Sequence, residues 1–273
     1  MGELESKEQR LSEQLGRVPA LIVAYSGGVD SAYLAYAAHR ALGDRMLAVT
    51  ALSASYSARD RREAEACVAR FGLPHEFIET DELSNPSYRA NNPDRCFFCK
   101  DELFDKLDEM AARRGFAAVA YGVNLDDQGD WRPGQRAARN HQVLAPLLDA
   151  GLTKADIREL ARRADVPVWN RPASACLSSR IAYGIEVTPE RLRIVERGEE
   201  ALRELGFRQM RVRYHEDLVR IEIAAEELPR ALSPEMAQKL AEIFKALGFK
   251  FVTLDLEGYR TGSLNTHLIQ IHN

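Results

Sequence analysis

Several features are scarce in this sequence of 273 residues, and each shortage excludes a class of protein. No apolar run approaches the roughly 20 residues that a membrane-spanning helix needs. Asp and Glu (41) outnumber Lys and Arg (37), and a net charge of −4 argues against a protein that holds nucleic acid through bulk positive charge. Residues 1–17 are polar and lack the apolar core of a signal peptide. We therefore expect a soluble, cytoplasmic protein with neither a membrane nor a nucleic acid as its partner.

Cysteine is also scarce. Four thiols in a reducing compartment are not expected to form a disulfide framework. Cys67 lies at helical spacing from Ala64, Val68 and Phe71, and a free cysteine behaves as a small apolar side chain. We therefore assign Cys67 to the core, which leaves three cysteines for chemistry.

The first two thirds of the chain alternate short apolar strands with helices. Such alternation predicts an α/β fold, a doubly wound parallel sheet with helices on both faces and its ligand at the carboxyl ends of the strands. The expected strands are 20–25, 46–52, 75–80 and 117–121, and the expected helices are 31–42, 59–71 and 101–114.

The pattern changes after about Tyr183. Thr188 and Pro189 are typical of a helix start, and residues 210–214 and 218–223 alternate like a hairpin. A further helix at 234–247 and a strand at 251–255 complete a small α+β domain. We therefore predict two domains, residues 1–184 and residues 185–273.

Residues 26–31, Ser-Gly-Gly-Val-Asp-Ser, connect a buried strand to a helix. Two glycines allow a tight turn that presents backbone N–H groups, and the helix start favours an anion. Ser26 and Ser31 add hydroxyl groups, whereas Asp30 would repel phosphate unless a divalent cation such as Mg²⁺ bridges the two. The segment is not a Walker loop, because it lacks that loop's Lys and spacing. It predicts a polyphosphate site.

Cys96 and Cys99 form a C-x-x-C pair after a loop rich in Asn and Pro. A redox disulfide would lack its usual strand-to-helix context, and a zinc site would lack a second ligand pair. With Cys176 the pair gives three thiolates, which suit a [4Fe–4S] cluster with one open iron. All three interpretations stay open, because local sequence cannot bring Cys176 close to Cys96.

The segment 26–31 resembles the PP-loop signature of the N-type ATP pyrophosphatases, which include NAD and GMP synthetases. That resemblance implies that ATP is split into AMP and pyrophosphate, with AMP passing to a substrate oxygen. Over essentially the entire chain the sequence is similar to one branch, the LarE family of ATP-dependent sulfur transferases of nickel-pincer nucleotide biosynthesis. The agreeing segments are residues 122–127, 131–134, 170–180, 183–184, 211–213 and 258–262.

The resemblance implies a pyridinium mononucleotide substrate whose carboxylate becomes a thiocarboxylate, a sulfide or other sulfur donor, and a homo-oligomer. One kind of member consumes a single cysteine as its sulfur source, and the other carries three cysteines and a [4Fe–4S] cluster. Cys96, Cys99 and Cys176 match the second kind, although Cys176 also lies where a sacrificial cysteine could lie.

The candidate site residues follow from their own chemistry together with this resemblance. Asp30 and Cys176 are the candidate catalytic residues, and Asp30 is also the candidate Mg²⁺ ligand. The candidate ATP-binding residues are Ser26, Gly27, Gly28, Asp30, Ser31 and Gly122. The candidate substrate-binding residues are Ser179, Arg180, Arg211, Arg213 and Arg260.

Several of these assignments have plain alternatives. Arg211 and Arg213 point to the same face of a strand and could clamp a phosphate, or could lie on a solvated face with Glu222 or Asp217 across the hairpin. Glu199 has mostly polar neighbours, and we expect it at the surface. Asp126, Asp127 and Asp130 follow a strand end and could hold Mg²⁺ or face solvent.

Two other functions compete with a LarE-like sulfur transferase. A tRNA thiolase also joins a PP-loop to three cysteines, but the net charge of −4 and the small second domain speak against RNA binding. An ATP-binding sensor would leave both Asp30 and the three cysteines unexplained.

Overall fold

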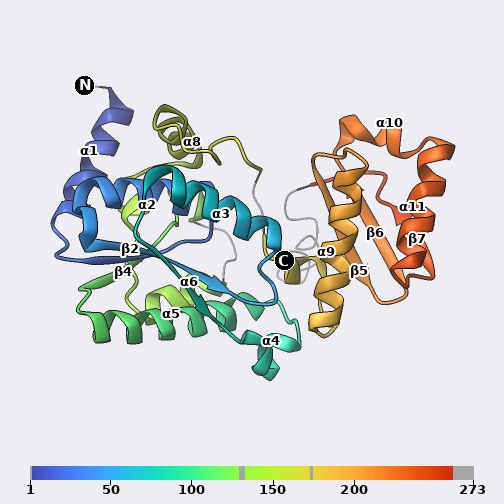
Figure 1. Ribbon diagram of the computed structural model, residues 1–273, viewed down its shortest axis with the longest axis horizontal. Coiled ribbons are helices and arrows are strands. Elements are labelled where there is room, and N and C mark those ends of the chain that lie inside the picture. Colours follow the sequence, from blue (N-terminus) through green and yellow to red (C-terminus); the bar gives the residue numbers. More distant parts are fainter. Residues whose placement is uncertain (1, 129–132, 173–174, 261–273) are drawn as a thin grey trace, which may run out of the picture. The chain divides into compact units, whose positions relative to one another are not determined.

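The computed structural model describes residues 2–128, 133–172 and 175–260 of the chain. It divides into two compact units (Figure 1). The first unit comprises Met1–Glu82 and Cys96–Ser174, and the second comprises Leu83–Arg95 and Ala175–Asn273.

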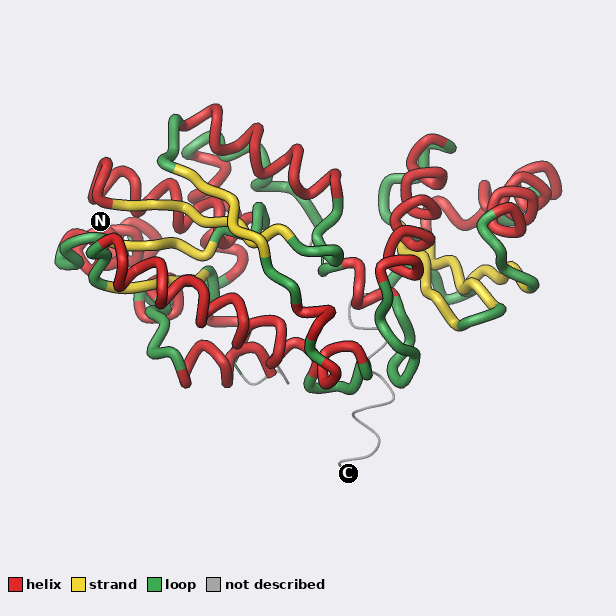
Figure 2. The backbone as a smooth tube through the Cα atoms, turned by 60° about the horizontal axis from the view of Figure 1, so that its bottom comes forward, coloured by secondary structure: helices red, strands yellow, loops and turns green. Residues whose placement is uncertain are grey.

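The first unit is built on a four-stranded parallel sheet. Its strands are β1 (Leu21–Ala24), β2 (Met46–Leu52), β3 (His75–Glu79) and β4 (Ala118–Tyr121). They lie in the order β3-β2-β1-β4, and every neighbouring pair is parallel. Figure 2 shows these strands side by side. The predicted α/β class and all four expected strands are confirmed.

Both faces of this sheet are covered. Leu21 and Val23 of β1 belong to one apolar core, whereas Ile22 and Ala24 belong to the other, as the period of two requires. Figure 1 shows α2, α3 and α8 on one side of the sheet and α5 on the other. The helices of this unit are α1 (Glu3–Gly16), α2 (Val29–Leu42), α3 (Ala58–Phe71), α5 (Arg95–Arg114), α6 (Pro133–Asn140), α7 (Pro146–Asp149) and α8 (Lys154–Arg163), with 3-10 turns at Gly43–Arg45, Glu82–Ser84 and Leu125–Asp127.

The first core confirms the prediction for Cys67, which is 1% exposed within it. Leu34 of α2 is fully buried in the same core. Burying one leucine side chain contributes roughly 1.5–3 kcal/mol to the free energy of unfolding, so the packing of α2 stabilises the β1–α2 connection. That connection is the segment 26–31.

One predicted helix begins earlier than expected. Helix α5 begins at Arg95 rather than at residue 101, so Cys96 and Cys99 lie in its first turn and not in a loop. Gly134 of α6 packs there: a Cβ at that position would lie 3.0 Å from Lys100 Cγ and 3.4 Å from the Cys96 carbonyl oxygen. Packing of α6 on this turn thus accompanies the early start of α5, which the sequence pattern did not predict.

The second unit is a small mixed sheet with helices, as predicted. Strands β5 (Met210–His215) and β6 (Leu218–Ile223) form the expected antiparallel hairpin, and β7 (Phe251–Leu254) pairs in parallel with β6. Thr188 caps α9 (Pro189–Glu204) by accepting a hydrogen bond from the Arg191 N–H. The other helices are α4 (Pro86–Arg89), α10 (Leu228–Ala231) and α11 (Pro234–Ala246), with 3-10 turns at Leu177–Arg180 and Ala225–Glu227.

The segment Leu83–Arg95 belongs to the second unit through buried polar contacts. The Asn91 side-chain amide donates to the carbonyl oxygens of Ala182 and Ile185, each at 2.9 Å, and the Arg95 guanidinium donates to the Ser178 carbonyl oxygen at 2.9 Å. Residues 83–95 and 175–184 therefore group with the C-terminal segment, whereas the predicted division at 184/185 places both in the first domain.

In the part of the chain that the structure describes, no helix combines the length and the apolar character needed to cross a membrane.

Candidate active site

The segment 26–31 forms a compact loop at the carboxyl end of the central strand β1. Gly27 has φ +77°, a conformation that glycine adopts without strain, and Gly28 caps α2. The Ser26 and Ser31 hydroxyl oxygens lie 3.0 Å apart, and the Ser26 N–H donates to the Ser31 hydroxyl at 3.1 Å. The loop and the start of α2 thus gather N–H and hydroxyl groups where an anion is favoured.

Gly122 follows β4, the strand beside β1, and touches this loop. A Cβ at Gly122 would lie 2.7 Å from the Ser31 backbone nitrogen and 3.0 Å from the Asp30 carbonyl carbon. Both atoms belong to backbone at the start of α2 and cannot rotate away. Only glycine therefore allows this close approach of the β4 end to the loop.

Asp30 lies in the first turn of α2 and forms an ion pair with a lysine that lies 124 residues further along the chain. Lys154 Nζ is 2.5 Å from Asp30 Oδ2, and both side chains are half-buried. Lys154 is the first residue of α8, which Thr153 caps. The run Thr153-Lys-Ala-Asp156 is a capping-box pattern, so the sequence does hold a signal for a helix start at Lys154. A single carboxylate suits an Mg²⁺ ion that is bound mainly by substrate phosphates, so Asp30 fits that role.

The acidic residues after β4 have structural contacts. The Asp127 carboxylate accepts from the Asn124 N–H at 3.1 Å, and the Asn124 side chain accepts from the Asp126 N–H at 2.9 Å. Asp126 in turn accepts from the Lys154 N–H at 2.6 Å. Asp126 and Asp127 thereby shape the turn beside Lys154, and Asp130 lies outside the described residues.

An open groove of about 530 Å³ lies beyond the ends of β2 and β3. Ligands of parallel sheets bind at this edge, outside the carboxyl ends of the strands. Its volume falls in the range of small-molecule sites. The lining residues are Leu52, Ser53, Ala54, Glu79, Thr80, Asp81 and Lys106.

The three cysteines are divided between the two units. Cys96 is exposed and Cys99 is half-buried, and their spacing of three places both thiols on one face of α5 in the first unit. Cys176 is half-buried and precedes the 3-10 turn Leu177–Arg180 in the second unit. Two thiols on one helix face provide soft ligands of the kind that an iron–sulfur cluster takes.

The Cys176 backbone is held by its neighbours. The Ser179 hydroxyl donates to the Cys176 carbonyl oxygen at 2.7 Å, and the Arg180 guanidinium donates to the same oxygen at 3.0 Å. Arg180 also pairs with Glu199 of α9 at 2.8 Å, where the two side chains are only 3% and 2% exposed. A buried ion pair therefore fixes the arginine that holds the Cys176 segment.

The expectation that Glu199 lies at the surface is wrong. Glu199 occupies the buried stripe of α9 together with Leu192, Val195 and Leu202. This stripe has helical spacing and is visible in the sequence, whereas the polar nearest neighbours of Glu199 face other directions. Burial raises the pKa of Glu199, but the charge and hydrogen bonds of Arg180 outweigh it and leave that pKa below its ordinary value.

Arg213 pairs with the residue that the plain alternative named. Its guanidinium contacts the Glu222 carboxylate at 2.8 and 3.0 Å, but Glu222 is fully buried rather than on a solvated face. Arg213 also donates to the Ser179 carbonyl oxygen at 3.0 Å. The β5–β6 hairpin is thereby tied to the turn that carries Ser179 and Arg180.

Arg211 lies in the same unit, and its guanidinium donates to the Met210 carbonyl oxygen at 2.7 Å. Its guanidinium is 4.9 Å from the centre of the Tyr259 ring. Burial lowers the pKa of Arg211, and the positive charge of Arg180 lowers it further. Glu199 and Tyr259 act in the opposite direction, so Arg211 belongs to a group of buried charges of both signs. A guanidinium in such a group can bind an anion such as a phosphate. Arg260 is exposed and pairs with Glu257 at 2.5 Å.

The structure thus gathers the predicted residues in two places. The predicted ATP-binding residues of the first unit lie around the loop 26–31, with Lys154 as an addition. In the second unit, hydrogen bonds, ion pairs and electrostatic interactions link Cys176, Ser179, Arg180, Arg211 and Arg213.

Comparisons with known proteins agree with this geometry. A family model described as NAD synthase matches residues 6–117. An uncharacterised protein of Synechocystis is 41% identical over 96% of this chain and 98% of its own length. The pyridinium-3,5-bisthiocarboxylic acid mononucleotide synthase of Lactiplantibacillus plantarum is 33% identical over 98% of this chain and 97% of its own length. A component of the glutamine-hydrolysing GMP synthase of Pyrococcus furiosus is 27% identical over 75% of this chain and 70% of its own length.

Proposed function

Because this chain belongs to the LarE family of PP-loop ATP pyrophosphatases, we propose that it uses ATP to thiolate a carboxylate of a pyridinium dicarboxylate mononucleotide. The L. plantarum pyridinium-3,5-bisthiocarboxylic acid mononucleotide synthase belongs to the same family. The observation that carries this proposal is the loop 26–31 at the end of β1, which contains the paired hydroxyl groups of Ser26 and Ser31 and the Asp30 carboxylate.

The first step is adenylation. The loop N–H groups and the Ser26 and Ser31 hydroxyls bind the ATP phosphates, and Asp30 holds the Mg²⁺ that accompanies them. A carboxylate oxygen of the substrate attacks the α-phosphorus, the bond from the α-phosphorus to the β-bridging oxygen breaks, and pyrophosphate leaves. The acyl-adenylate then has a carbon open to a sulfur nucleophile, with AMP as the leaving group.

The second unit offers the surface for the mononucleotide. We assign its phosphate first to Arg211, because its guanidinium lies in one unit with Arg180 and Arg213 and a guanidinium matches the geometry of a phosphate. Ser179 adds a hydroxyl group close to Cys176, whereas Arg180 and Arg213 are buried and act by holding the backbone of Cys176 and Ser179. Arg260 is an exposed candidate near the end of the described chain.

The sulfur route is the finer part of the proposal. Cys96, Cys99 and Cys176 are the residues that would hold a [4Fe–4S] cluster, and a set of three thiolates suits it. When bound, such a cluster would carry the sulfur that sulfide or another donor supplies. The alternative, in which Cys176 gives up its own sulfur, is favoured by one observation: Cys176 shares a unit with Ser179 and Arg180, whose side chains hold its carbonyl oxygen.

The test is an anaerobic product assay with ATP, Mg²⁺, sulfide and the pyridinium dicarboxylate mononucleotide. We expect AMP, pyrophosphate and a thiocarboxylate, whereas release of ADP and orthophosphate would refute the adenylation step. If a cluster carries the sulfur, Cys96→Ala, Cys99→Ala and Cys176→Ala each lose sulfur transfer but keep adenylation, and the buried control Cys67→Ala keeps both.

The sacrificial alternative gives a different pattern in the same assay. Only Cys176→Ala would then lose sulfur transfer, one sulfur would appear per chain, and mass spectrometry would find dehydroalanine at position 176. Assembly into a homo-oligomer and a cytoplasmic location belong to the same proposal; light scattering and cell fractionation test them.

A further inference from the structure

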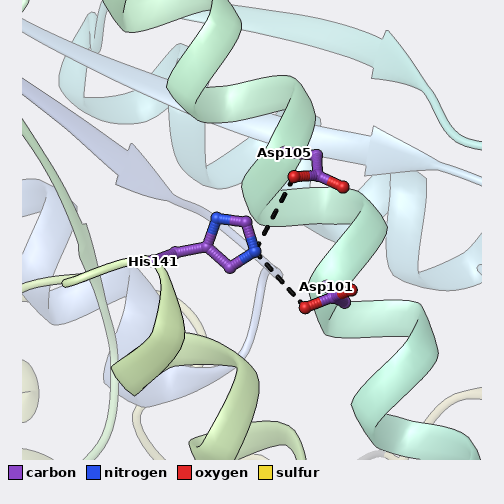
Figure 3. Close-up of side chains that lie close together, drawn as sticks. All are labelled: Asp101, Asp105 and His141. Carbon is purple, nitrogen blue, oxygen red and sulfur yellow. Dashed lines mark hydrogen bonds and ion pairs between the residues drawn. The ribbon is translucent and has the colours of Figure 1, made fainter.

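A cluster of metal-ligating side chains lies away from the loop 26–31, on α5 and just after α6. Asp101 and Asp105 are one helical turn apart on α5, and His141 directly follows α6 (Figure 3). His141 Nε2 is 3.3 Å from Asp101 Oδ1 and 3.8 Å from Asp105 Oδ1. One ligand atom from each residue lies within 4.8 Å of the other two. All three residues belong to the first unit.

The contact made by the other ring nitrogen of His141, Nδ1, determines whether Nε2 presents a hydrogen or a lone pair to Asp101 and Asp105. His141 Nδ1 lies 2.7 Å from Asp108 Oδ2, and a carboxylate oxygen accepts hydrogen bonds, so Nδ1 carries the hydrogen and donates. In the neutral imidazole Nε2 then has a lone pair, directed toward the oxygens of Asp101 and Asp105. A nitrogen lone pair close to two carboxylates is unfavourable unless a positive charge lies between the nitrogen and the carboxylate oxygens.

That charge is either a proton or a metal ion. Burial lowers the pKa of His141, but the hydrogen bonds to Asp108 and Asp101 outweigh it and leave that pKa above its ordinary value. A proton therefore satisfies the arrangement in the absence of an ion. The same arrangement, with one ring nitrogen held by a carboxylate and the other aimed at further ligands, is the one that metal-binding histidines use.

The separations also suit an ion. Ligand atoms about 2.0–2.2 Å from a common ion lie roughly 2.8–3.1 Å from one another in octahedral geometry and roughly 3.3–3.6 Å in tetrahedral geometry. The Nε2 to Asp101 separation of 3.3 Å already meets this requirement. The Nε2 to Asp105 separation of 3.8 Å is longer, and the three ligand atoms lie within 4.8 Å of one another, so Asp105, whose side chain is 72% exposed, has to move toward the other two ligands to share an ion with them.

We propose that Asp101, Asp105 and His141 bind one divalent transition-metal ion, with Asp108 as the positioning residue that orients His141. An imidazole ligand favours Zn²⁺, Co²⁺ or Ni²⁺ over Mg²⁺ and Ca²⁺, and three protein ligands leave positions for water. The ion links the end of α6 to α5, the helix whose first turn carries Cys96 and Cys99. This site is independent of the proposed sulfur transfer.

Anaerobic titration of the full chain with Co²⁺ tests the proposal. Thiolate-bound Co²⁺ gives an intense sulfur-to-metal charge-transfer band, whereas a nitrogen–oxygen site gives only weaker visible bands. The spectrum therefore distinguishes Co²⁺ bound by the cysteines from Co²⁺ bound by Asp101, Asp105 and His141. We expect one equivalent without the thiolate band. His141→Gln and Asp105→Asn should each weaken this binding at least about 30-fold, and Asp108→Asn about 10- to 100-fold, the usual effect of losing an orienting partner.

A matched control and a second readout keep the test decisive. Glu109→Gln removes an exposed carboxylate from the same helix and should leave Co²⁺ affinity unchanged. NMR of chain labelled with ¹⁵N-histidine, with Zn²⁺ as a diamagnetic probe, should show His141 Nε2 bound to metal; the His141→Gln spectrum assigns the signal. The proposal is overturned if His141→Gln binds Co²⁺ as the wild type does, or if His141 stays doubly protonated in excess Zn²⁺ at neutral pH.

Discussion

The buried pair of Arg180 and Glu199 offers a sharp test of how the second unit holds the Cys176 segment. Glu199→Gln keeps the size of the side chain but removes its charge. The carboxylate accepts from Arg180 at 2.8 and 3.2 Å and from Arg203 at 3.2 Å, and it is 2% exposed. The change therefore leaves the Arg180 guanidinium buried beside a neutral amide.

The expected cost follows from that burial. Breaking a buried pair by removing one charge costs about 3–5 kcal/mol, and we expect the lower end because glutamine still accepts one hydrogen bond. At roughly 2–4 °C per kcal/mol for a chain of this size, the melting temperature should fall by about 6–12 °C. Thermal and urea unfolding of the full chain measure both quantities.

The next residue supplies a matched control. Glu200 also pairs with Arg203, at 2.8 Å, but its side chain is 49% exposed. An exposed pair contributes about 1 kcal/mol or less, so Glu200→Gln should hardly change the free energy of unfolding. If Glu199→Gln costs no more than Glu200→Gln, the Arg180–Glu199 pair does not hold this unit together, and our argument fails.

The same pair predicts a pH dependence with a definite sign. The folded-state pKa of Glu199 lies below its ordinary value of 4.5. Its contribution to the free energy of unfolding is therefore fully present above about pH 4.5 and is lost as the pH falls through the lower folded-state value. The stability difference between wild type and Glu199→Gln should shrink in that acid range, and a constant difference would contradict the assignment.

Three further changes test the candidate residues of the two units. Asp30→Ala should slow formation of AMP and pyrophosphate at least ~100-fold in a quenched-flow assay, because a catalytic metal contact is lost. Arg211→Ala should weaken mononucleotide binding by about 1.5–3 kcal/mol in calorimetry and leave ATP binding near normal, with the exposed Arg208→Ala as control; the opposite pattern would move Arg211 to the ATP site. Gly122→Ala forces a Cβ to 2.7 Å from the Ser31 nitrogen and should weaken ATP binding by about 1–3 kcal/mol, whereas Gly16→Ala, with open space around it, should not.

The sequence predicted the elements whose cause is local. The sequence predicts β2 with its observed bounds, Met46–Leu52, because a short continuous apolar run is typical of a buried strand. Thr188 with Pro189 located the start of α9 because capping is a contact between near neighbours in the chain. The turn of the loop 26–31 was predictable for the same reason: its glycines and hydroxyl groups act on one another over six residues.

What the sequence did not predict depends on contacts between distant segments. The early start of α5 accompanies the packing of Gly134 of α6 on its first turn. The transfer of Leu83–Arg95 to the second unit depends on Asn91 and Arg95, whose partners lie about 90 residues further along the chain. Glu199 is a different case, because the helical spacing of its apolar stripe is present in the sequence, while its polar nearest neighbours face other directions on the helix.

The Asp30–Lys154 pair changes the electrostatic argument for the ATP site. From the sequence, a carboxylate within a phosphate loop is a repulsive charge that only a divalent cation offsets. In the structure the Lys154 ammonium lies 2.5 Å from Asp30, so the carboxylate is already neutralised by the chain itself. The positive end of α2 then acts on an incoming phosphate without opposition from Asp30. In the proposed function, Mg²⁺ arriving with the ATP phosphates would compete with Lys154 for the Asp30 carboxylate, and the Lys154 ammonium would then be available to the phosphate charge.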